Sequence, residues 1–285
     1  MAPVTTVALL ARKAGLAPEL FSRYWRDVHG TLAARIPGFD SYVQYHLGAP
    51  WPLALPVAVA DAARFDGFAE VGFRDDGDRA GLAGSEVAAL IQADEQNVFR
   101  TTLLYNLAAG ASRTLFERGA TPQPPPASAL LLLGRRPGTA HQALIDAIEQ
   151  ALLPALSAQP GVLRLRLHAL ASGDPSLWVT AGVDNRQTPD QAFDAILQVD
   201  GASVGGLAEA VQAGGAAAPA SLYRVLGRLQ GYPVAARYAM VQAGRPTHLG
   251  LRGWDVLQTI TAAGARNQLG EAVTRCLYGI DAADA

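Results

Sequence analysis

The chain has 285 residues, 50% of them hydrophobic, so it can bury one large core or two smaller ones. Its 23 basic and 25 acidic residues give a formal net charge of -2, a balance that does not favour nucleic acid or an anionic membrane as the main partner. The single cysteine, Cys276, excludes a disulfide framework and a cysteine-based zinc site within one chain.

No apolar run approaches the roughly 18 residues needed to span a bilayer. The N-terminus also lacks a basic segment before its short apolar run, unlike a secretory signal. A lone cysteine fits a reducing compartment. We therefore expect a soluble, cytoplasmic protein.

Residues 1–110 predict the order strand, helix, strand, strand, helix, strand. Short β-branched or alternating runs predict the strands, and apolar residues at helical spacing predict the helices. The expected strands are 4–10, 39–47, 68–73 and 101–107, with one helix from Pro18 to about Arg35 and another through Val87, Leu90 and Ile91. This order is the ferredoxin-like one.

Four prolines in residues 121–127 predict a stiff spacer between two units. We predict a first unit over residues 1–118, a Pro-rich linker over 119–127, and a second unit with a C-terminal helical extension over 128–285. The same order of elements begins again after the linker. The expected strands are 129–133, 162–170, 193–199 and 222–229, the helices are 141–156 and 204–212, and an extended piece at 237–242 precedes a closing helix through Trp254, Leu257, Leu269, Val273 and Leu277.

A Pro-Gly pair stands between helix and strand in both halves, as Pro37-Gly38 and Pro160-Gly161, and indicates an internal repeat. Matching these pairs aligns Tyr45 with His168, whereas matching the polar strand faces aligns His46 with His168. A one-residue change of register turns every side chain of a strand over. We adopt the match of the faces, because burial constrains a strand more than loop length does.

Five short segments of the first half carry a resemblance to a known family. They are Phe21-x-x-Tyr24-Trp25-x-x-x-His29-Gly30, Ile36-Pro37-Gly38, Tyr42-x-Gln44-x-His46, Asp66-Gly67-Phe68-Ala69-Glu70 and Ala93-Asp94-Glu95. Over residues 4–108 the chain resembles an EthD-type domain of the dimeric α/β-barrel superfamily. The resemblance implies an α+β fold in which two ferredoxin-like (β-α-β-β-α-β) units pair their antiparallel sheets into one barrel. Here both units lie on one chain, as a pseudo-dimer.

The second half lacks the aromatic and histidine signature of the first. The positions that correspond to Phe21, Trp25 and His29 are Leu144, Ile148 and Leu152. We therefore interpret the chain as a tandem duplication whose second copy is degenerate, and we expect the working site in the first unit.

His29 lies at the border of the apolar stripe that Phe21, Trp25, Val28 and Leu32 form on the first helix. An imidazole exchanges protons near neutral pH, which suits general acid–base catalysis. A capping or buried, hydrogen-bonded histidine is the structural alternative.

Tyr42, Gln44 and His46 share one face of the second strand. They could present a phenol, an amide and a base to a ligand, a set suited to proton transfer next to a carbonyl. Solvent or the other sheet could cover this face instead. We predict His29 and His46 as the catalytic proton carriers, with Tyr42 as their hydrogen-bonding partner.

Four residues are predicted to bind the substrate: Trp25, Gln44, Glu70 and Asn106. A buried carboxylate at Glu70 would need a partner, and a salt bridge to Arg12 is its structural alternative. Asp94 is interpreted as a turn or helix-end residue rather than an acid.

Arg164, Arg166 and His168 form a polar stripe in the second half, which could bind a carboxylate or phenolate or could be an ion-paired surface. No phosphate-binding glycine motif, metal-ligand spacing or nucleophile elbow occurs, so we expect no cofactor and no metal. Haem is the alternative, with His168 as its first candidate ligand, because tandem ferredoxin-like chains can bind haem through one histidine.

Known members of the superfamily include cofactor-free monooxygenases, lactone isomerases, polyketide dehydratases and decarboxylases, and haem enzymes, so the fold alone does not settle the reaction. We predict a cofactor-independent enzyme of the lyase or dehydratase type, acting on a small hydrophobic, aromatic or polyketide-like carbonyl compound. The alternatives are a cofactor-free monooxygenase on a similar substrate and a non-catalytic protein that binds a small ligand or assists assembly. We expect no nucleic acid or membrane partner, and a homodimer remains open.

Overall fold

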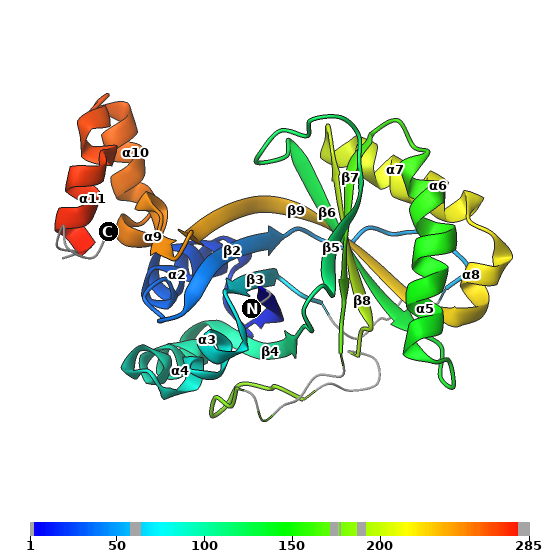
Figure 1. The fold of residues 1–285 in the computed structure, drawn as a ribbon, viewed down its shortest axis with the longest axis horizontal. Helices are drawn as coiled ribbons and strands as arrows, with labels where there is room; N and C mark the ends of the chain where they lie inside the picture. Colours follow the sequence, from blue (N-terminus) through cyan, green and yellow to red (C-terminus); the bar gives the residue numbers. More distant parts are fainter. Residues whose placement is uncertain (1–2, 58–63, 172–175, 177, 187–191, 279–285) are drawn as a thin grey trace.

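The computed structural model describes residues 3–57, 64–171, 176, 178–186 and 192–278. Helices cover the outer sides of two groups of strands that meet in the middle of the molecule (Figure 1). A further set of C-terminal helices projects beside the first group. In this described part of the chain, no helix is long and apolar enough to cross a membrane.

The first unit has the predicted order of elements. Its strands are β1 (Val4–Arg12), β2 (Phe39–Leu47), β3 (Gly67–Phe73) and β4 (Phe99–Asn106), and its helical segments are α1 (Pro18–Tyr24), a π-helical turn (Trp25–His29), α2 (Gly30–Ala33), α3 (Asp76–Ala80), a 3-10 turn (Leu82–Gly84) and α4 (Glu86–Val98). The first three helical segments follow one another without a break and together form the predicted first helix.

Local signals in the sequence set the ends of these helices. Pro18 occupies the first turn of α1, where its missing N–H costs no hydrogen bond. Gly38 has a φ of 84°, a conformation that glycine adopts readily and that turns the chain into β2. Ser85 caps α4, because its side chain accepts a hydrogen bond from the Ala88 N–H.

The second unit repeats this order. Its strands are β6 (Ala127–Arg135), β7 (Val162–Ala169), β8 (Ala195–Gly201) and β9 (Leu226–Gln242), and its helical segments are α5 (His141–Ala147), a π-helical turn (Ile148–Leu152), α6 (Leu153–Ser157), α7 (Val204–Ala217) and α8 (Ala220–Val225). The predicted α+β fold with two ferredoxin-like units on one chain is therefore confirmed.

Some details of the second half differ from the prediction. Residues 220–225 are helical rather than extended, and β9 continues through the piece expected separately at 237–242. The predicted single closing helix is wrong. The C-terminal part contains β10 (Arg245–Pro246), α9 (His248–Arg252), α10 (Trp254–Ala262), a 3-10 turn (Arg266–Leu269) and α11 (Glu271–Tyr278). Gly253, with a φ of 81°, ends α9 and lets the chain change direction.

Each unit extends a strand into the other. The first half of β9 pairs with β6 of its own unit, and the second half pairs with β2 of the first unit. In the same way β5 (Ser112–Glu117) follows β4 and pairs with β7 of the second unit. The strand order is β4-β1-β3-β2-β9-β6-β8-β7-β5. Backbone pairing therefore joins the two sheets through β9, whereas β5, which precedes the predicted linker, pairs with the second unit alone.

Three buried apolar clusters make up the core. One lies between the helices and the sheet of the first unit and includes Trp25 and Tyr42. A second occupies the same position in the second unit and includes Leu144. The third combines strand residues of both units, such as Tyr45 and Ile196, and fills the barrel between the sheets.

The register that we adopted between the two halves is wrong. His168 is fully buried and packs against Phe68 of the barrel cluster, as does Tyr45, with which the Pro-Gly match aligns it. His46 lies on the opposite, helix-facing side of β2, where it stacks on Trp25. Matching the polar faces of β2 and β7 failed because these faces lie on opposite sides of the sheet. The polar face of β7 points into the barrel, whereas that of β2 points toward the helices.

Glu70 meets a cation inside the barrel, but that cation is Arg166 rather than the expected Arg12. Arg166 Nη1 lies 2.6 Å from Glu70 Oε1, and the Tyr45 hydroxyl donates to Oε2 at 3.1 Å. Arg12 instead pairs with Asp66 at 3.3 Å. Burial alone would raise the pKa of Glu70, but the charges of Arg166 and His168 and the hydrogen bonds from Arg166 and Tyr45 together outweigh it and hold the pKa below its usual range.

The rest of the polar stripe on β7 is also paired. Arg164 Nη2 lies 2.6 Å from Asp200 Oδ2, and His168 Nδ1 lies 3.0 Å from the hydroxyl of Ser112. The stripe is thus the ion-paired face that the sequence left open, although it lies within the barrel and not at the surface. We do not propose it as a substrate site.

Replacing Glu70 by alanine should destabilise the fold by about 3 kcal/mol, because Arg166 would remain in the barrel without its carboxylate. The effect should shrink as the pH falls below about 4, where the wild-type carboxyl group also loses its charge and with it the stabilisation. Chemical denaturation of wild type and variant at several pH values measures the loss of unfolding free energy and its dependence on pH. The control Arg74→Ala removes an exposed ion pair to Asp78 and should cost less than about 1 kcal/mol. Equal losses for the two variants would contradict the prediction.

Candidate functional site

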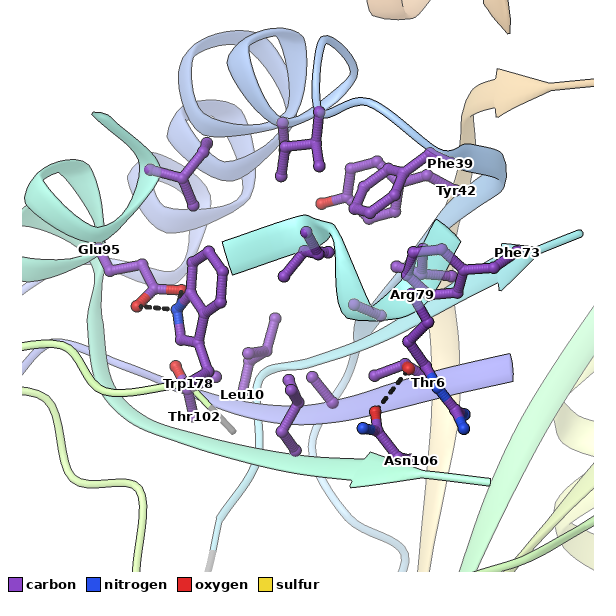
Figure 2. Close-up of a pocket in the computed structure, with 18 of the residues that line it drawn as sticks. Thr6, Leu10, Phe39, Tyr42, Phe73, Arg79, Glu95, Thr102, Asn106 and Trp178 are labelled. Atoms are coloured by element: carbon purple, nitrogen blue, oxygen red, sulfur yellow. Dashed lines mark hydrogen bonds between the residues drawn. The ribbon is translucent and has the colours of Figure 1, made fainter. Parts of the chain in front are cut away.

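A cavity of about 490 Å³ lies between the helices and the sheet of the first unit (Figure 2). Its wall is mostly apolar and includes Leu10, Trp25, Phe39, Phe73, Ile91 and Phe99. Only a few polar side chains interrupt this wall. A small hydrophobic ligand would fit such a site in both size and character.

The first helix approaches the cavity through a π-helical turn, Trp25–His29, in which the Gly30 N–H donates to the Trp25 carbonyl. The second unit has the same turn at Ile148–Leu152, so the turn belongs to the repeated fold. The positions also confirm the predicted equivalence of these residues. What distinguishes the first unit is the side chains that the turn carries.

Glycine at two positions makes room for Trp25 and its surroundings. A Cβ atom at Gly67 would lie 2.6 Å from Cζ3 of the Trp25 indole. A Cβ atom at Gly30 would lie 2.4 Å from Nε2 of Gln44. Trp25 itself is fully buried and lines the cavity.

His29 lines the cavity and is held from behind by Asp94. Its Nδ1 lies 3.0 Å from Asp94 Oδ2, while Tyr24 donates to Oδ1 of the same carboxylate at 2.5 Å. Burial alone would raise the pKa of Asp94, but the hydrogen bonds from His29 and Tyr24 lower it, so the carboxylate stays ionised. Asp94 lies about one turn from the end of α4, and its ionised carboxylate orients His29.

Gln44 links the two polar neighbours on its strand face. Its Nε2 donates to the Trp25 carbonyl and to the Tyr42 hydroxyl oxygen, both at 2.9 Å. Its Oε1 lies 3.2 Å from His46 Nε2. Gln44 is fully buried and does not line the cavity, so it positions Tyr42 instead of binding the substrate.

Tyr42 lines the cavity, and its hydroxyl oxygen accepts hydrogen bonds from both Gln44 and the Trp25 indole. Burial is the main reason that the pKa of Tyr42 rises to about 12, so its hydroxyl group stays protonated. Because the oxygen already accepts from two donors, its own proton is available to a ligand.

His46 does not line the cavity, which contradicts its predicted role as a proton carrier. Ser22 Oγ lies 2.7 Å from its Nδ1, Gln44 occupies its Nε2, and the ring stacks on Trp25 with centroids 4.4 Å apart. Burial lowers the pKa of His46 to about 3, so the ring is neutral at physiological pH. Its place in the fold is structural.

The sequence prediction missed Glu95, which lies at one end of the cavity (Figure 2). The Trp178 indole N–H lies 2.9 and 3.0 Å from its two oxygens, and the Thr180 hydroxyl donates to Oε2. Glu95 belongs to the Ala93-Asp94-Glu95 motif, so its position was a usable signal. Trp178 comes from the second unit, and no local pattern pointed to it.

The other end of the cavity carries polar side chains as well (Figure 2). Asn106 lines it, as predicted, and its Oδ1 accepts a hydrogen bond from Thr6 at 2.7 Å. Arg79 lies beside them and pairs with Asp76 (Figure 2). Glu70, predicted to bind the substrate, faces the barrel and does not line the cavity.

Haem does not fit the candidate ligand, His168. This residue has no exposed surface, its Nδ1 is engaged by Ser112, and it does not line the cavity of the first unit. Its Nε2 is buried without a hydrogen-bond partner among the described residues, and the ring packs against Phe68 inside the barrel, whereas a porphyrin would need an open slot beside the histidine. The described residues also include no group of three or more histidine, cysteine, aspartate or glutamate side chains that could hold a metal ion.

Comparisons with known proteins agree with this architecture. Residues 13–101 match the family model of the EthD domain, and no curated protein matches the chain. An anthrone oxidase-like protein of known structure is similar, with a TM-score of 0.52 and 11% identity over 84% of this chain and 94% of that one.

Two candidate monooxygenases of known structure are more distant. The protein from Fusobacterium nucleatum subsp. nucleatum has a TM-score of 0.47 and 6% identity over 86% of this chain and 97% of that one. The protein from Lactobacillus acidophilus has a TM-score of 0.43 and 12% identity over 86% and 98%. At such identities the likeness concerns the fold alone. Residues 13–101 of this chain match the EthD domain, and the chain as a whole has the dimeric α/β-barrel fold with both units on one polypeptide.

Proposed function

We propose that the cavity is the active site of a cofactor-independent enzyme that removes a proton from a carbon next to a carbonyl group. The substrate class is a small hydrophobic, aromatic or polyketide-like carbonyl compound, and the reaction type is that of a lyase or dehydratase. The observation that carries the proposal is His29, which lines a cavity with a largely apolar and aromatic wall and is held from behind by Asp94.

His29 is the base in this proposal. When its Nδ1–H donates to the ionised Asp94, its Nε2 is the nitrogen that accepts a proton, and the described residues offer Nε2 no hydrogen-bond partner. An oriented imidazole with one free nitrogen is the usual arrangement for general base catalysis.

Tyr42 stabilises the charge that forms on the carbonyl oxygen. Gln44 and Trp25 hold its oxygen, and its pKa of about 12 keeps the hydroxyl group protonated at every working pH. A fixed donor inside an apolar cavity interacts strongly with a developing oxyanion, because little water competes.

The aromatic wall supports the substrate class. Trp25, Phe39, Phe73 and Phe99 surround a cavity of about 490 Å³, which suits a molecule of a few rings. Ring-to-ring contacts would add about 0.5–1.5 kcal/mol each to the gain from burial.

A cofactor-free monooxygenase would begin with the same proton removal and then let the anion react with dioxygen, so the base and the oxyanion donor suit it equally. A non-catalytic binding protein would favour a cavity without ionisable groups. The presence of His29 in the wall, held by a carboxylate, supports catalysis.

His29→Ala should slow exchange of the α-protons of a β-aryl β-hydroxy ketone with deuterated water by about 10²–10⁴-fold, because the base is lost. The aldol adduct of benzaldehyde and acetone is a suitable probe, followed by proton NMR. His141→Ala, which alters a histidine of the second unit, should exchange at the wild-type rate. Full exchange by His29→Ala would refute the assignment of the base.

Tyr42→Phe should lower kcat by about 10²-fold and leave KM within a few-fold of wild type, because the hydroxyl group acts on the oxyanion more than on the ground-state carbonyl. Steady-state kinetics with the same adduct separate the two constants. A large rise in KM with unchanged kcat would show that Tyr42 only binds the substrate.

Oxygen dependence separates the lyase from the monooxygenase. We expect the wild-type protein to turn the adduct over equally fast in air and under nitrogen, since elimination needs no oxidant. A rate that falls in proportion to dissolved oxygen, with oxygen incorporated into the product, would favour the monooxygenase instead.

A further inference from the structure

We infer that Glu95 is the catalytic acid that protonates the leaving hydroxyl group, and that the substrate is therefore a β-hydroxy carbonyl compound that loses water. This inference rests on the proposed function, because it assigns the second half of the same reaction. It gives the second unit a part in the chemistry, since Trp178 and Thr180 hold the acid.

Asp94 and Glu95 are consecutive residues of α4, and they serve different steps: Asp94 holds the base His29, and Glu95 protonates the leaving group. Side chains at neighbouring helix positions point about 100° apart. Asp94 reaches His29 from behind, whereas Glu95 lines the cavity itself with only 5% of its surface exposed. The base and the acid therefore face one ligand from different directions.

Glu95 is held by neutral groups. Both of its oxygens face the Trp178 indole N–H, at 2.9 and 3.0 Å, and Thr180 hydrogen-bonds to one of them. The other buried glutamate of the chain, Glu70, has Arg166 at 2.6 Å. Burial raises the pKa of Glu95, and the hydrogen bonds and the nearby His29 only partly offset it.

The segment that carries Trp178 is fixed on the first unit. The Thr102 N–H donates to the Asp184 carbonyl at 2.9 Å, and the Asp184 N–H donates to the Arg100 carbonyl at 2.8 Å. These bonds attach residues 178–186, a described part of the connection between β7 and β8, to the edge of β4. The indole reaches Glu95 from there, as Figure 2 shows.

The elimination balances without an oxidant or a cofactor. His29 Nε2 takes the α-proton, and the electrons of the C–H bond move onto the carbonyl oxygen, where Tyr42 donates a hydrogen bond. The enolate then forms the Cα–Cβ double bond as the Cβ–O bond breaks, and the departing oxygen takes a proton from Glu95 and leaves as water. A proton then passes from the imidazolium of His29 to the carboxylate of Glu95, so that both groups return to their starting protonation states. Paired ionisable groups with opposite protonation states are typical of acid–base sites.

The first experiment compares α-proton exchange with elimination, using the benzaldehyde–acetone adduct in deuterated water. Glu95→Gln should keep exchange within about tenfold of wild type while losing elimination by about 10²-fold or more, since only the acid is missing. His29→Ala should lose both. The control Glu86→Gln, which alters an exposed glutamate at the start of α4, should keep both. Elimination at the wild-type rate by Glu95→Gln would overturn the inference, whereas absence of exchange in the wild type would instead count against the proposed function.

The second experiment does not depend on turnover. The infrared difference between wild type and Glu95→Gln at neutral pH should contain the C=O stretching band of a protonated carboxyl group, and Trp178→Phe should shift that band, because the indole donates to the carboxyl oxygens. The difference spectrum between wild type and the control Glu86→Gln should contain no band of a protonated carboxyl group. A difference spectrum with only carboxylate bands would show that Glu95 is ionised and would overturn its role as an acid.

Discussion

The pairing of β9 with both sheets is the constraint on which the rest of the structure depends. Its first half completes the second unit and its second half extends the sheet of the first, while β5 follows β4 along the chain and pairs with β7 of the second unit. With the two sheets joined in this way, Asp184, from the connection between β7 and β8, bonds to β4. The cavity of the first unit is thereby completed by a side chain of the second, Trp178.

The polar groups near the cavity are of two kinds, according to how completely they are hydrogen-bonded within the protein. His46 and Gln44 are satisfied on every side and hold Trp25 and Tyr42 in place. His29, by contrast, has one nitrogen engaged and lines the cavity. In a medium of low polarity an unpaired group that faces a ligand interacts with it strongly, so the few incompletely paired groups dominate the chemistry.

The sequence predicted what depends on local patterns. Periodicity gave the order of elements, and the motif around Trp25, His29 and Tyr42 gave three residues that line the cavity. Alternation could not say which face of β7 is inside the barrel, because a polar interior and a solvated surface look alike in sequence. The contribution of Trp178 lay beyond local reasoning altogether, since it meets Glu95 across 83 positions.

The same fold explains why only one unit carries the site. Both units have the π-helical turn, but the second places Ile148 and Leu152 where the first has Trp25 and His29. These aliphatic side chains join the buried cluster beneath the helices of the second unit and fill its space. The first unit thus carries His29 and the cavity, and the second supplies Trp178 to the wall of that cavity. The first unit alone would lack the indole that holds Glu95, so the second unit contributes to the cavity and is more than a scaffold.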